Sequence, residues 1–350
     1  MLQLEGQALD EYLVEPSVNV RTAVTVLEQT GKGICLVVST DKRKLIGTIT
    51  DGDVRRLLLK QGSLDLKASE ISNPKPVSAP SGYGLRQYEE ICQVNKIRHL
   101  PLLGQGRQLE GLFLLHSDGG EANDCRLVIM AGGKGTRLKP LTDNCPKPLL
   151  EIGGRPILER IIEKARKEGI KKISITVNYL KDMIIDCIGD GERLGVEVEY
   201  IEESKPLGTA GGLIDLKGSE KTILVTNGDV ITDISYTDVL AFHNMNGAEA
   251  TMAVKSYEWA SPYGVVEVEG IEMISIREKP IYREYVNAGI YAIERRQIAK
   301  HIQGEYCDMP TLFQRIRQGN GRTIAYPMHE PWIDIGRHEE LDQARKKLSS

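Results

Sequence analysis

The pattern of apolar and polar positions predicts an alternating strand–helix domain in the C-terminal part of the chain. Short, mostly apolar runs are typical of buried strands, whereas apolar positions at helical spacing predict amphipathic helices. Strands are expected at 127–130, 172–177, 196–200 and 222–226, and helices at 157–168 and 181–188. This alternation predicts an α/β domain with a mixed, mainly parallel sheet covered by helices, whose ligand crevice lies at the carboxyl ends of the strands.

The first 120 residues follow a different pattern, which repeats weakly after about 60 residues. Each repeat has a helical pattern and two strands, with helices expected at 23–27, 53–59 and 85–94 and strands at 34–38, 45–50, 99–103 and 109–115. Asp53 is a plausible N-cap of the second helix. The pattern predicts an α+β domain at 1–120, and the small polar run 116–124 is the expected linker to a second domain at 125–350.

Composition excludes several classes of protein. The 350 residues are 41% hydrophobic and 27% charged, which is ordinary for a globular chain, and the net charge of −4 argues against a nucleic-acid partner. Neither a basic, apolar leader nor a run long enough to span a membrane is visible, so we expect a cytoplasmic protein without a membrane partner. The six cysteines are scattered without a Cys-x-x-Cys pair, which favours reduced thiols over a zinc site or disulfides.

A glycine-rich, cationic loop follows the first strand of the C-terminal domain. Gly132, Gly133 and Gly135 lack a Cβ, so backbone N–H groups can approach a bound anion closely. The cations in and after the loop are Lys134, Arg137, Lys139 and Lys147. Backbone donors and fixed cations together predict a triphosphate site. The loop is not a P-loop, because no Gly-Lys-Ser/Thr follows, and its cationic second half does not fit a dinucleotide-binding fingerprint.

The residues 131–142, together with Pro146–Leu149, resemble the opening motif of the sugar-1-phosphate nucleotidyltransferases. Further motifs of that family follow in order from about residue 125 to the end: Leu207–Gly211, Asn227–Asp229, Tyr263–Gly264, Glu278–Pro280, Val286–Gly289 and Trp332–Gly336. The resemblance implies a Rossmann-like nucleotidyltransferase domain. It also implies that an oxygen of a sugar 1-phosphate attacks the α-phosphorus of a nucleoside triphosphate (NTP) and expels pyrophosphate.

This reaction needs positioning and charge neutralisation rather than a general base, because the nucleophile is already an anion near neutral pH. That agrees with the lack of a convincing His or Cys constellation. Arg137 is expected to hold the β- and γ-phosphates, and Lys147 to reach the α-phosphate. Lys134, at the tip of the loop, can instead be only solvated.

Two aspartates are the candidate metal ligands. Asp229 comes directly after a buried strand, where a carboxylate can bind a hard cation such as Mg²⁺ or can serve only as a turn or capping residue. Asp334 has the same two readings. The resemblance implies that Asp229 and Asp334 together hold a catalytic Mg²⁺, with Asp229, Arg137 and Lys147 as the catalytic residues.

The resemblance also assigns the substrate-binding residues. The expected nucleotide-binding residues are Ala131, Gly132, Gly133, Gly135, Thr136, Gly208, Thr209 and Ala210. The expected sugar-phosphate-binding residues are Gly264, Glu278, Lys279 and Asn287. Residues 207–212 can alternatively form a plain turn, and Glu278 with Lys279 a solvated surface pair.

The N-terminal repeats resemble a tandem pair of cystathionine-β-synthase-type (CBS) domains. Residues 47–56 are close to that family's adenosine-nucleotide motif, in which Thr50 and Asp53 would meet ribose hydroxyls. In the second repeat Leu114 and Ser117 replace the expected Thr and Asp, which leaves its nucleotide site in doubt. The pair can therefore bind an adenine nucleotide or serve only in packing and homo-oligomerisation.

Several substrates remain open. A CBS pair fused to such a domain resembles the glucosamine-1-phosphate guanylyltransferases of bacterial legionaminic-acid pathways, which favours GTP and an amino-hexose phosphate for surface-glycan synthesis. Mannose- or heptose-1-phosphate with GTP is the next alternative, and glucose-1-phosphate with dTTP or UTP follows. A different class, a non-catalytic adenine-nucleotide sensor or scaffold, conflicts with the presence of Arg137, Lys147, Asp229 and Asp334.

Overall fold

The computed structural model describes residues 2–40, 43–60, 62–95, 97–115 and 125–348. Its chain forms two compact units, Met1–Asp118 and Gly119–Ser350. The linker expected at 116–124 lies outside the described residues. Within the described part of the chain, no helix is both long and apolar enough to cross a membrane.

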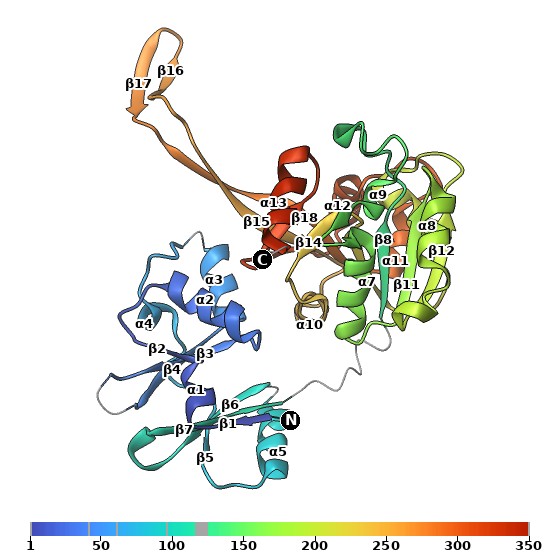
Figure 1. Cartoon of the computed structure of the whole chain (residues 1–350). Helices are drawn as coiled ribbons and strands as arrows, with labels where there is room; N and C mark the ends of the chain where they lie inside the picture. Colours follow the sequence, from blue (N-terminus) through green and yellow to red (C-terminus); the bar gives the residue numbers. More distant parts are fainter. Residues whose placement is uncertain (1, 41–42, 61, 96, 116–124, 349–350) are drawn as a thin grey trace. The chain divides into compact units, whose positions relative to one another are not determined.

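The N-terminal unit is an α+β structure built on two small sheets (Figure 1). One sheet has the order β2 (Leu13–Val14), β3 (Ile34–Val38), β4 (Leu45–Thr50), and the other β1 (Leu2–Leu4), β7 (Leu109–Leu114), β6 (His99–Leu103), β5 (Ala79–Pro80). The helices are α1 (Gln7–Asp10), α2 (Val20–Thr30), α3 (Asp51–Leu59), α4 (Ala68–Ile71) and α5 (Leu85–Asn95). The antiparallel hairpins β3–β4 and β6–β7 occupy the strand positions expected from the two repeats.

The start of α3 corrects the prediction for Asp53. The helix begins at Asp51 with Thr50 as its N-cap, so Asp53 is in the first turn. The Asp53 Oδ2 accepts a hydrogen bond from the Thr50 backbone N–H, with N and O 2.8 Å apart. This is the reach-back contact of a capping box, which explains why an acid at this position was mistaken for the cap itself.

The C-terminal unit contains a seven-stranded sheet in the order β12–β11–β8–β13–β18–β15–β19. Its strands are β8 (Arg126–Met130), β11 (Lys172–Val177), β12 (Glu197–Glu202), β13 (Thr222–Asn227), β15 (Ala250–Ala260), β18 (Ile281–Glu294) and β19 (Thr323–Met328). All neighbours are parallel except the pairs β13–β18 and β18–β15, which confirms the mixed, mainly parallel sheet. The boundaries expected for the strands and helices between 127 and 226 agree within two residues.

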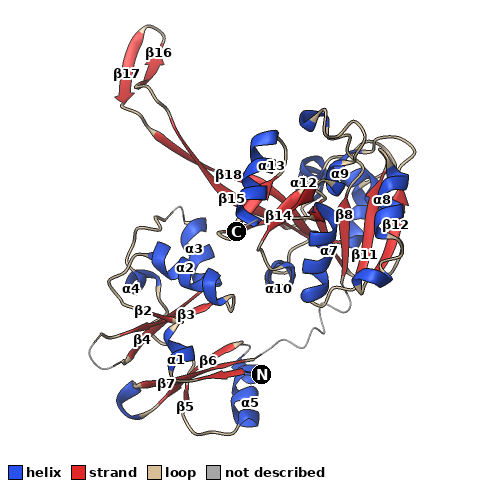
Figure 2. Ribbon diagram, viewed as in Figure 1, coloured by secondary structure: helices blue, strands red, loops and turns tan. Residues whose placement is uncertain are grey.

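Helices cover both faces of this sheet, as Figure 2 shows. Leu127 and Ile129 of β8 belong to the core cluster that includes α7 (Ile157–Lys167), α8 (Lys181–Ile188), α10 (Tyr236–Met245) and α13 (His338–Leu348). Val128, between them, faces the opposite cluster, with α9 (Gly208–Gly211), α11 (Arg295–His301) and α12 (Met309–Gln318). The near-continuous apolar sequence of β8 follows from this double burial.

Three two-stranded ladders complete the unit: β9 (Glu151–Ile152) with β10 (Arg155–Pro156), β14 (Val230–Thr232) with β20 (Trp332–Asp334), and β16 (Val265–Glu269) with β17 (Glu272–Arg277). The β16–β17 ladder is the tip of a long arm. β15 and β18 continue beyond the sheet as a two-stranded ribbon that carries this hairpin away from the body of the unit (Figure 1).

Candidate active site

Lys147 and Asp229 form an ion pair at the carboxyl edge of the central strands. Asn227, the last residue of β13, lies opposite Met130 of β8, so the segments that follow both strands leave the sheet at the same place. Gly228 makes the approach possible, because a Cβ there would lie 2.8 Å from the Met130 carbonyl oxygen. The two charged side chains are 10% and 23% exposed, which places a largely desolvated pair where the strands end.

Asp334 joins this pair through the ladder between β14 and β20. Val230 pairs with Asp334, and the Ile335 N–H donates to the Asp229 carbonyl oxygen at 3.0 Å. Burial raises the pKa of Asp334, and the negative charge of Asp229 raises it further, against the opposing effect of the Lys147 and Arg137 charges. The structure therefore brings together two carboxylates that repel each other unless a cation or a proton intervenes.

The two carboxylates fit a hard divalent cation. Oδ1 of Asp229 and Oδ1 of Asp334 are both buried and have no hydrogen-bond partner among the described residues. Within the same residues, no group of three or more His, Cys, Asp or Glu side chains is placed to hold a metal. Mg²⁺ is commonly bound by one or two carboxylates, with substrate phosphates and water completing its coordination. Asp229 and Asp334 match that donor set.

Arg137 and Lys134 of the glycine-rich loop have different surroundings. Gly135 has a φ of 60°, and a Cβ there would lie 3.0 Å from Thr142 Cγ2, so the loop needs glycine at this position. Arg137, in the 3₁₀ turn η2 (Thr136–Leu138), lies beside Gly336, where a Cβ would be 3.2 Å from the guanidinium Nη1. Lys134 is exposed. Arg137 therefore faces the Asp334 segment.

Residues 208–211 form a short helix, α9, rather than the loop expected from sequence. The Thr209 hydroxyl accepts a hydrogen bond from the Met309 N–H at 2.9 Å, and the Thr209 N–H donates to Asp308 Oδ1 at 3.1 Å. Gly208 has a φ of 80°, and a Cβ there would lie 2.6 Å from the Cys307 carbonyl oxygen. The segment is thus fixed to the start of α12, with Ala210 and Gly211 buried and Thr209 exposed.

Glu203 is a candidate site residue that sequence reasoning missed. A Cβ on Gly132 would lie 3.4 Å from Glu203 Oε2, and one on Gly212 would lie 2.4 Å from Oε1. Its Oε1 is buried without a hydrogen-bond partner in the described part of the chain. Burial raises the pKa of the carboxyl, against the lowering effect of a hydrogen bond from the Leu207 backbone. Glu202 turns outward to Lys181, so strand alternation after the buried Ile201 was the signal that Glu203 turns the other way.

The four expected sugar-phosphate residues are not brought together. Asn287 donates to the Tyr291 hydroxyl at 2.8 Å, and its neighbour Ala288 accepts a hydrogen bond from the Trp332 indole at 2.9 Å, next to Asp334. Gly264, Glu278 and Lys279 are instead exposed on the arm. There they remain close to one another, since a Cβ on Gly264 would lie 3.0 Å from Glu278 Oε2.

In the N-terminal unit, Thr50 and Asp53 bond to each other. The Thr50 hydroxyl donates to Asp53 Oδ2 at 2.7 Å, and Arg56 pairs with Asp53 Oδ1. A ribose would have to compete with or extend this network. In the second repeat Leu114 is buried in β7, whereas Ser117 lies outside the described residues.

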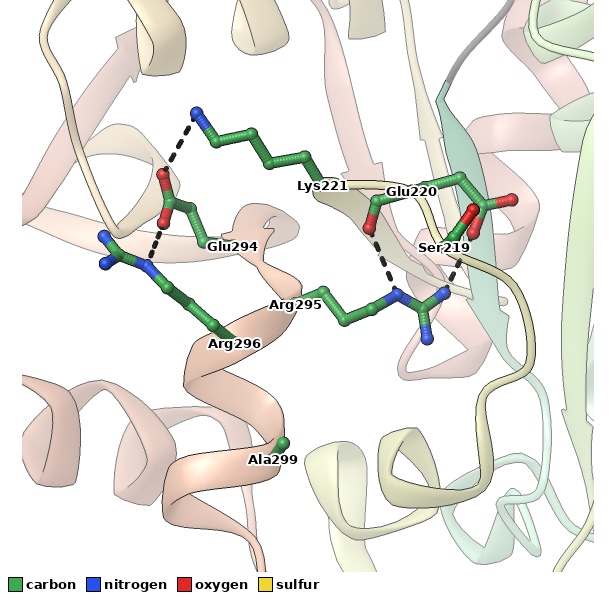
Figure 3. Close-up of a pocket in the computed structure, with 7 residues that line it drawn as sticks. All are labelled: Ser219, Glu220, Lys221, Glu294, Arg295, Arg296 and Ala299. Atoms are coloured by element: carbon green, nitrogen blue, oxygen red, sulfur yellow. Dashed lines mark hydrogen bonds and ion pairs between the residues drawn. The ribbon is translucent and has the colours of Figure 1, made fainter.

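A pocket of about 710 Å³ lies elsewhere in the unit, as Figure 3 shows. It is lined by Ser219, Glu220, Lys221, Glu294, Arg295, Arg296 and Ala299. These residues flank the start of β13 and the end of β18, which is the edge of the sheet opposite to Asp229. Arg295 pairs with Glu220, and Lys221 and Arg296 pair with Glu294, so each charged side chain of the pocket already has a partner of opposite charge. The chemistry points to the Asp229 edge instead.

Comparison with known proteins identifies the family of the C-terminal unit. The family model described as "Nucleotidyl transferase" matches residues 126–350, and a "CBS domain" model matches residues 10–60. "Probable mannose-1-phosphate guanylyltransferase 1" of Oryza sativa subsp. japonica is 31% identical over 240 residues, which are 63% of this chain and 66% of that protein. "UTP–glucose-1-phosphate uridylyltransferase" of Synechocystis sp. is 32% identical over 246 residues, which are 64% and 63%. The chain thus spans less than two thirds of the length of these relatives.

Solved structures share the fold of the C-terminal unit. A putative glucose-1-phosphate thymidylyltransferase from Bacillus anthracis aligns with a TM-score of 0.53 at 23% identity, covering 65% of this chain and 96% of that one. HddC from Yersinia pseudotuberculosis aligns with a TM-score of 0.50 at 25% identity, covering 63% and 98%. With the family model matching well over half of its residues, the chain belongs to the nucleotidyl transferase family and carries a CBS domain in its N-terminal unit.

Proposed function

We propose that this protein transfers a nucleoside monophosphate from an NTP to a sugar 1-phosphate, releasing pyrophosphate and forming an NDP-sugar. The observation that carries the proposal is the Lys147–Asp229 pair beside Asp334, with two buried carboxylate oxygens left without partners at the edge of the sheet where the glycine-rich loop begins. Family membership and the names of the relatives support the same reaction.

In this reaction a sugar-phosphate oxygen forms a bond to the α-phosphorus while the bond from the α-phosphorus to the bridging oxygen of the β-phosphate breaks. Pyrophosphate leaves with the electron pair of that bond. Lys147 would exchange its contact with Asp229 for the α-phosphate, and Arg137 would hold the departing phosphates. Bound between Asp229 and Asp334, Mg²⁺ would supply neutralisation of phosphate charge. The chain's own residues thus provide alignment and positive charge, which is what phosphoryl-type transfer requires.

For the nucleotide we favour GTP. Glu203 presents a buried carboxylate oxygen without a partner beside Gly132 and Gly212. A carboxylate can accept hydrogen bonds from the two adjacent N–H donors on the Watson–Crick edge of guanine, whereas uracil and thymine offer one N–H between two carbonyls. Glu203→Gln is then expected to lower kcat/KM for GTP more than for UTP. An equal loss with both nucleotides would contradict this role.

For the sugar we favour an amino-hexose 1-phosphate such as glucosamine 1-phosphate, for surface-glycan synthesis of the legionaminic-acid type. Mannose 1-phosphate gains support from the relatives named as mannose-1-phosphate guanylyltransferases. Heptose 1-phosphate with GTP and glucose 1-phosphate with dTTP or UTP are the remaining pairs. Pyrophosphate release measured with four NTPs against these sugar phosphates, with and without Mg²⁺, tests the reaction and the substrates together. No release with any pair would refute the proposal.

We further propose that the N-terminal unit is regulatory or contributes to dimerisation. If an adenine nucleotide binds, Thr50 and Asp53 should carry it, since they form the one polar cluster of the first repeat that matches the nucleotide motif. Calorimetry with AMP and ATP on the full chain and on Asp53→Ala tests this. If neither nucleotide gives a heat of binding with the full chain, the N-terminal unit serves only in packing or dimerisation. Residues 125–350 alone should keep the transfer activity, because the proposed catalytic residues all lie there.

A further inference from the structure

The arm formed by residues 255–286 leaves an apolar surface uncovered. Val266, Val268, Ile274 and Ile276 are 46%, 63%, 57% and 62% exposed. Val266 pairs with Ile276, and Val268 pairs with Met273, which is 64% exposed, so these paired side chains share one face. Ile274 is the extra residue at the bulge between the two pairs. The opposite face carries Glu267, which accepts a hydrogen bond from Ser275 at 3.0 Å. An isolated two-stranded hairpin is only marginally stable, so we expect this apolar face to pack against another protein surface.

The same arm separates residues that belong to one proposed site. Asn287 pairs with Val254 at the base of the arm, near the Asp229–Asp334 centre, whereas Ile281 pairs with Ala260 at the end of the ribbon. Six residues of extended strand separate these two positions, a distance on the order of 20 Å. Glu278 and Lys279 come just beyond Ile281. Their motif therefore lies far from the centre of its own chain.

The ribbon between them is built to stay extended. Its ladder is continuous from Lys255 opposite Val286 to Ala260 opposite Ile281. An Arg283–Glu258 ion pair of 2.7 Å and stacked Trp259 and Tyr282 rings, with centroids 5.4 Å apart, join its two strands. Folding the tip back onto its own centre would break these paired strands. Delivery of the tip to another molecule leaves them intact.

We propose that the active site is shared between two copies of this chain, with the arm of each copy carrying Gly264, Glu278 and Lys279 to the Asp229–Asp334 centre of the other. The proposal rests on the proposed function, because it assigns those residues to the sugar phosphate. A second copy is the occupant that satisfies both observations at once, since it supplies the missing half of the site and a surface that covers the apolar hairpin carried there. The arm's length suits an ordinary dimer interface, which uses about 20–30 residues on each side.

Complementation between two inactive variants tests the sharing. One variant, Asp229→Asn, loses the centre and keeps the arm; the other, Glu278→Gln with Lys279→Ala, keeps the centre and loses the arm. Each full-length homodimer is expected to be inactive. A heterodimer isolated through two different affinity tags should recover about half of the wild-type activity per dimer, because one of its two sites is intact. A heterodimer as inactive as its parents, beside an active wild-type protein, would show that the arm serves its own chain and would overturn the proposal.

A second measurement does not depend on activity. Val266→Glu with Ile276→Glu should raise the dissociation constant of the full-chain dimer in sedimentation, while Ser275→Glu, on the polar face of the same hairpin, should leave it unchanged. A monomeric wild-type protein, or a paired variant whose dimer dissociates no more readily than the wild type, would overturn the sharing whatever the assay shows. An inactive wild-type protein that is nevertheless dimeric through the arm would refute the proposed reaction rather than the interface.

Discussion

The two ends of the central strands in the C-terminal unit bury charge in opposite ways. At the start of β8 and β13, Arg126 donates to Glu220 at 3.1 Å and to Glu199 at 2.7 Å, and Arg295 donates to Glu220 at 2.9 Å. Burial raises the pKa of Glu220, but hydrogen bonds from its own backbone and Arg126, together with the charges nearby, lower it overall. At the carboxyl ends, Asp229 and Asp334 each keep a buried oxygen without a partner among the described residues.

The difference separates a structural cluster from the proposed binding site. Buried polar atoms in native proteins are almost always hydrogen-bonded, so unpartnered ones require an explanation. The Glu220 carboxylate is already paired with Arg126 and Arg295 of the same chain, so this cluster is not expected to bind a ligand. The Asp229 cluster has carboxylates, a lysine and an exposed arginine, and its unpartnered carboxylate oxygens would be paired only by a bound cation or ligand. Mutation of the Glu220 cluster is therefore expected to lower stability, whereas mutation of the Asp229 cluster is expected to lower activity.

The largest expected effect is the loss of activity in Asp229→Asn. The variant removes one carboxylate of the proposed metal pair and the partner of Lys147, so turnover should fall roughly 10³-fold or more while the fold persists. Pyrophosphate release and the far-ultraviolet circular dichroism spectrum measure the two parts. Near-normal turnover with Mg²⁺ would show that the Asp229 carboxylate is not needed for catalysis.

The loop cations give the next largest effect. Arg137→Ala should lower kcat/KM by about 100-fold, because it removes a bidentate donor to developing phosphate charge. Lys134→Ala, its matched control in the same loop, should stay within about fivefold, since an exposed lysine contributes little. The ratio of the two losses is the measurement. Equal losses would mean that the direction of Arg137 toward Gly336 does not reflect the liganded loop.

At the saturated end the expected effect is on stability. Glu220→Ala leaves Arg126 and Arg295 without their shared partner, and breaking a buried pair in this way costs about 3–5 kcal/mol of unfolding free energy. Activity per folded molecule should be unchanged. Thermal melting together with activity corrected for the folded fraction distinguishes the two ends. A variant with normal stability and impaired turnover would reverse the assignments.

Sequence predicted the fold and the centre better than it predicted the whole site. Strand and helix periodicity located β8, β11, β13 and α7 because each element buries its own apolar residues. Asp229 was visible because it directly follows such a strand. Strand alternation indicates that Glu203 turns inward, but it does not show that the side chain meets Gly132, which is distant in sequence.

The arm is a second feature that the sequence did not predict. A motif in the correct order, such as Glu278–Pro280, was assumed to reach the same centre as the other motifs of its chain. Order along the sequence does not fix whether an extended ribbon returns to its own domain or leaves it. That choice depends on the long pairing of β15 with β18, which local periodicity does not contain.

The smallest effect should be a gain of stability in Asp334→Asn. The raised pKa of Asp334 means that its ionised form is disfavoured in the folded chain. Stability without metal is therefore lost as pH rises from the ordinary carboxyl pKa through the raised one, and it stays lower above that window. Removing the charge should raise the melting temperature at neutral pH by a few degrees, and the gain should shrink toward acid pH.

Mg²⁺ supplies the complementary measurement for Asp334. The ion should raise the melting temperature of the wild-type protein at neutral pH more than that of Asp334→Asn, because it binds the pair that the variant has lost. It should do so less at acid pH, where protons already relieve the repulsion between Asp229 and Asp334. Equal stabilisation of both proteins would place the metal elsewhere. A lower melting temperature for the metal-free variant would mean that Asp334 is held by its surroundings much as Glu220 is.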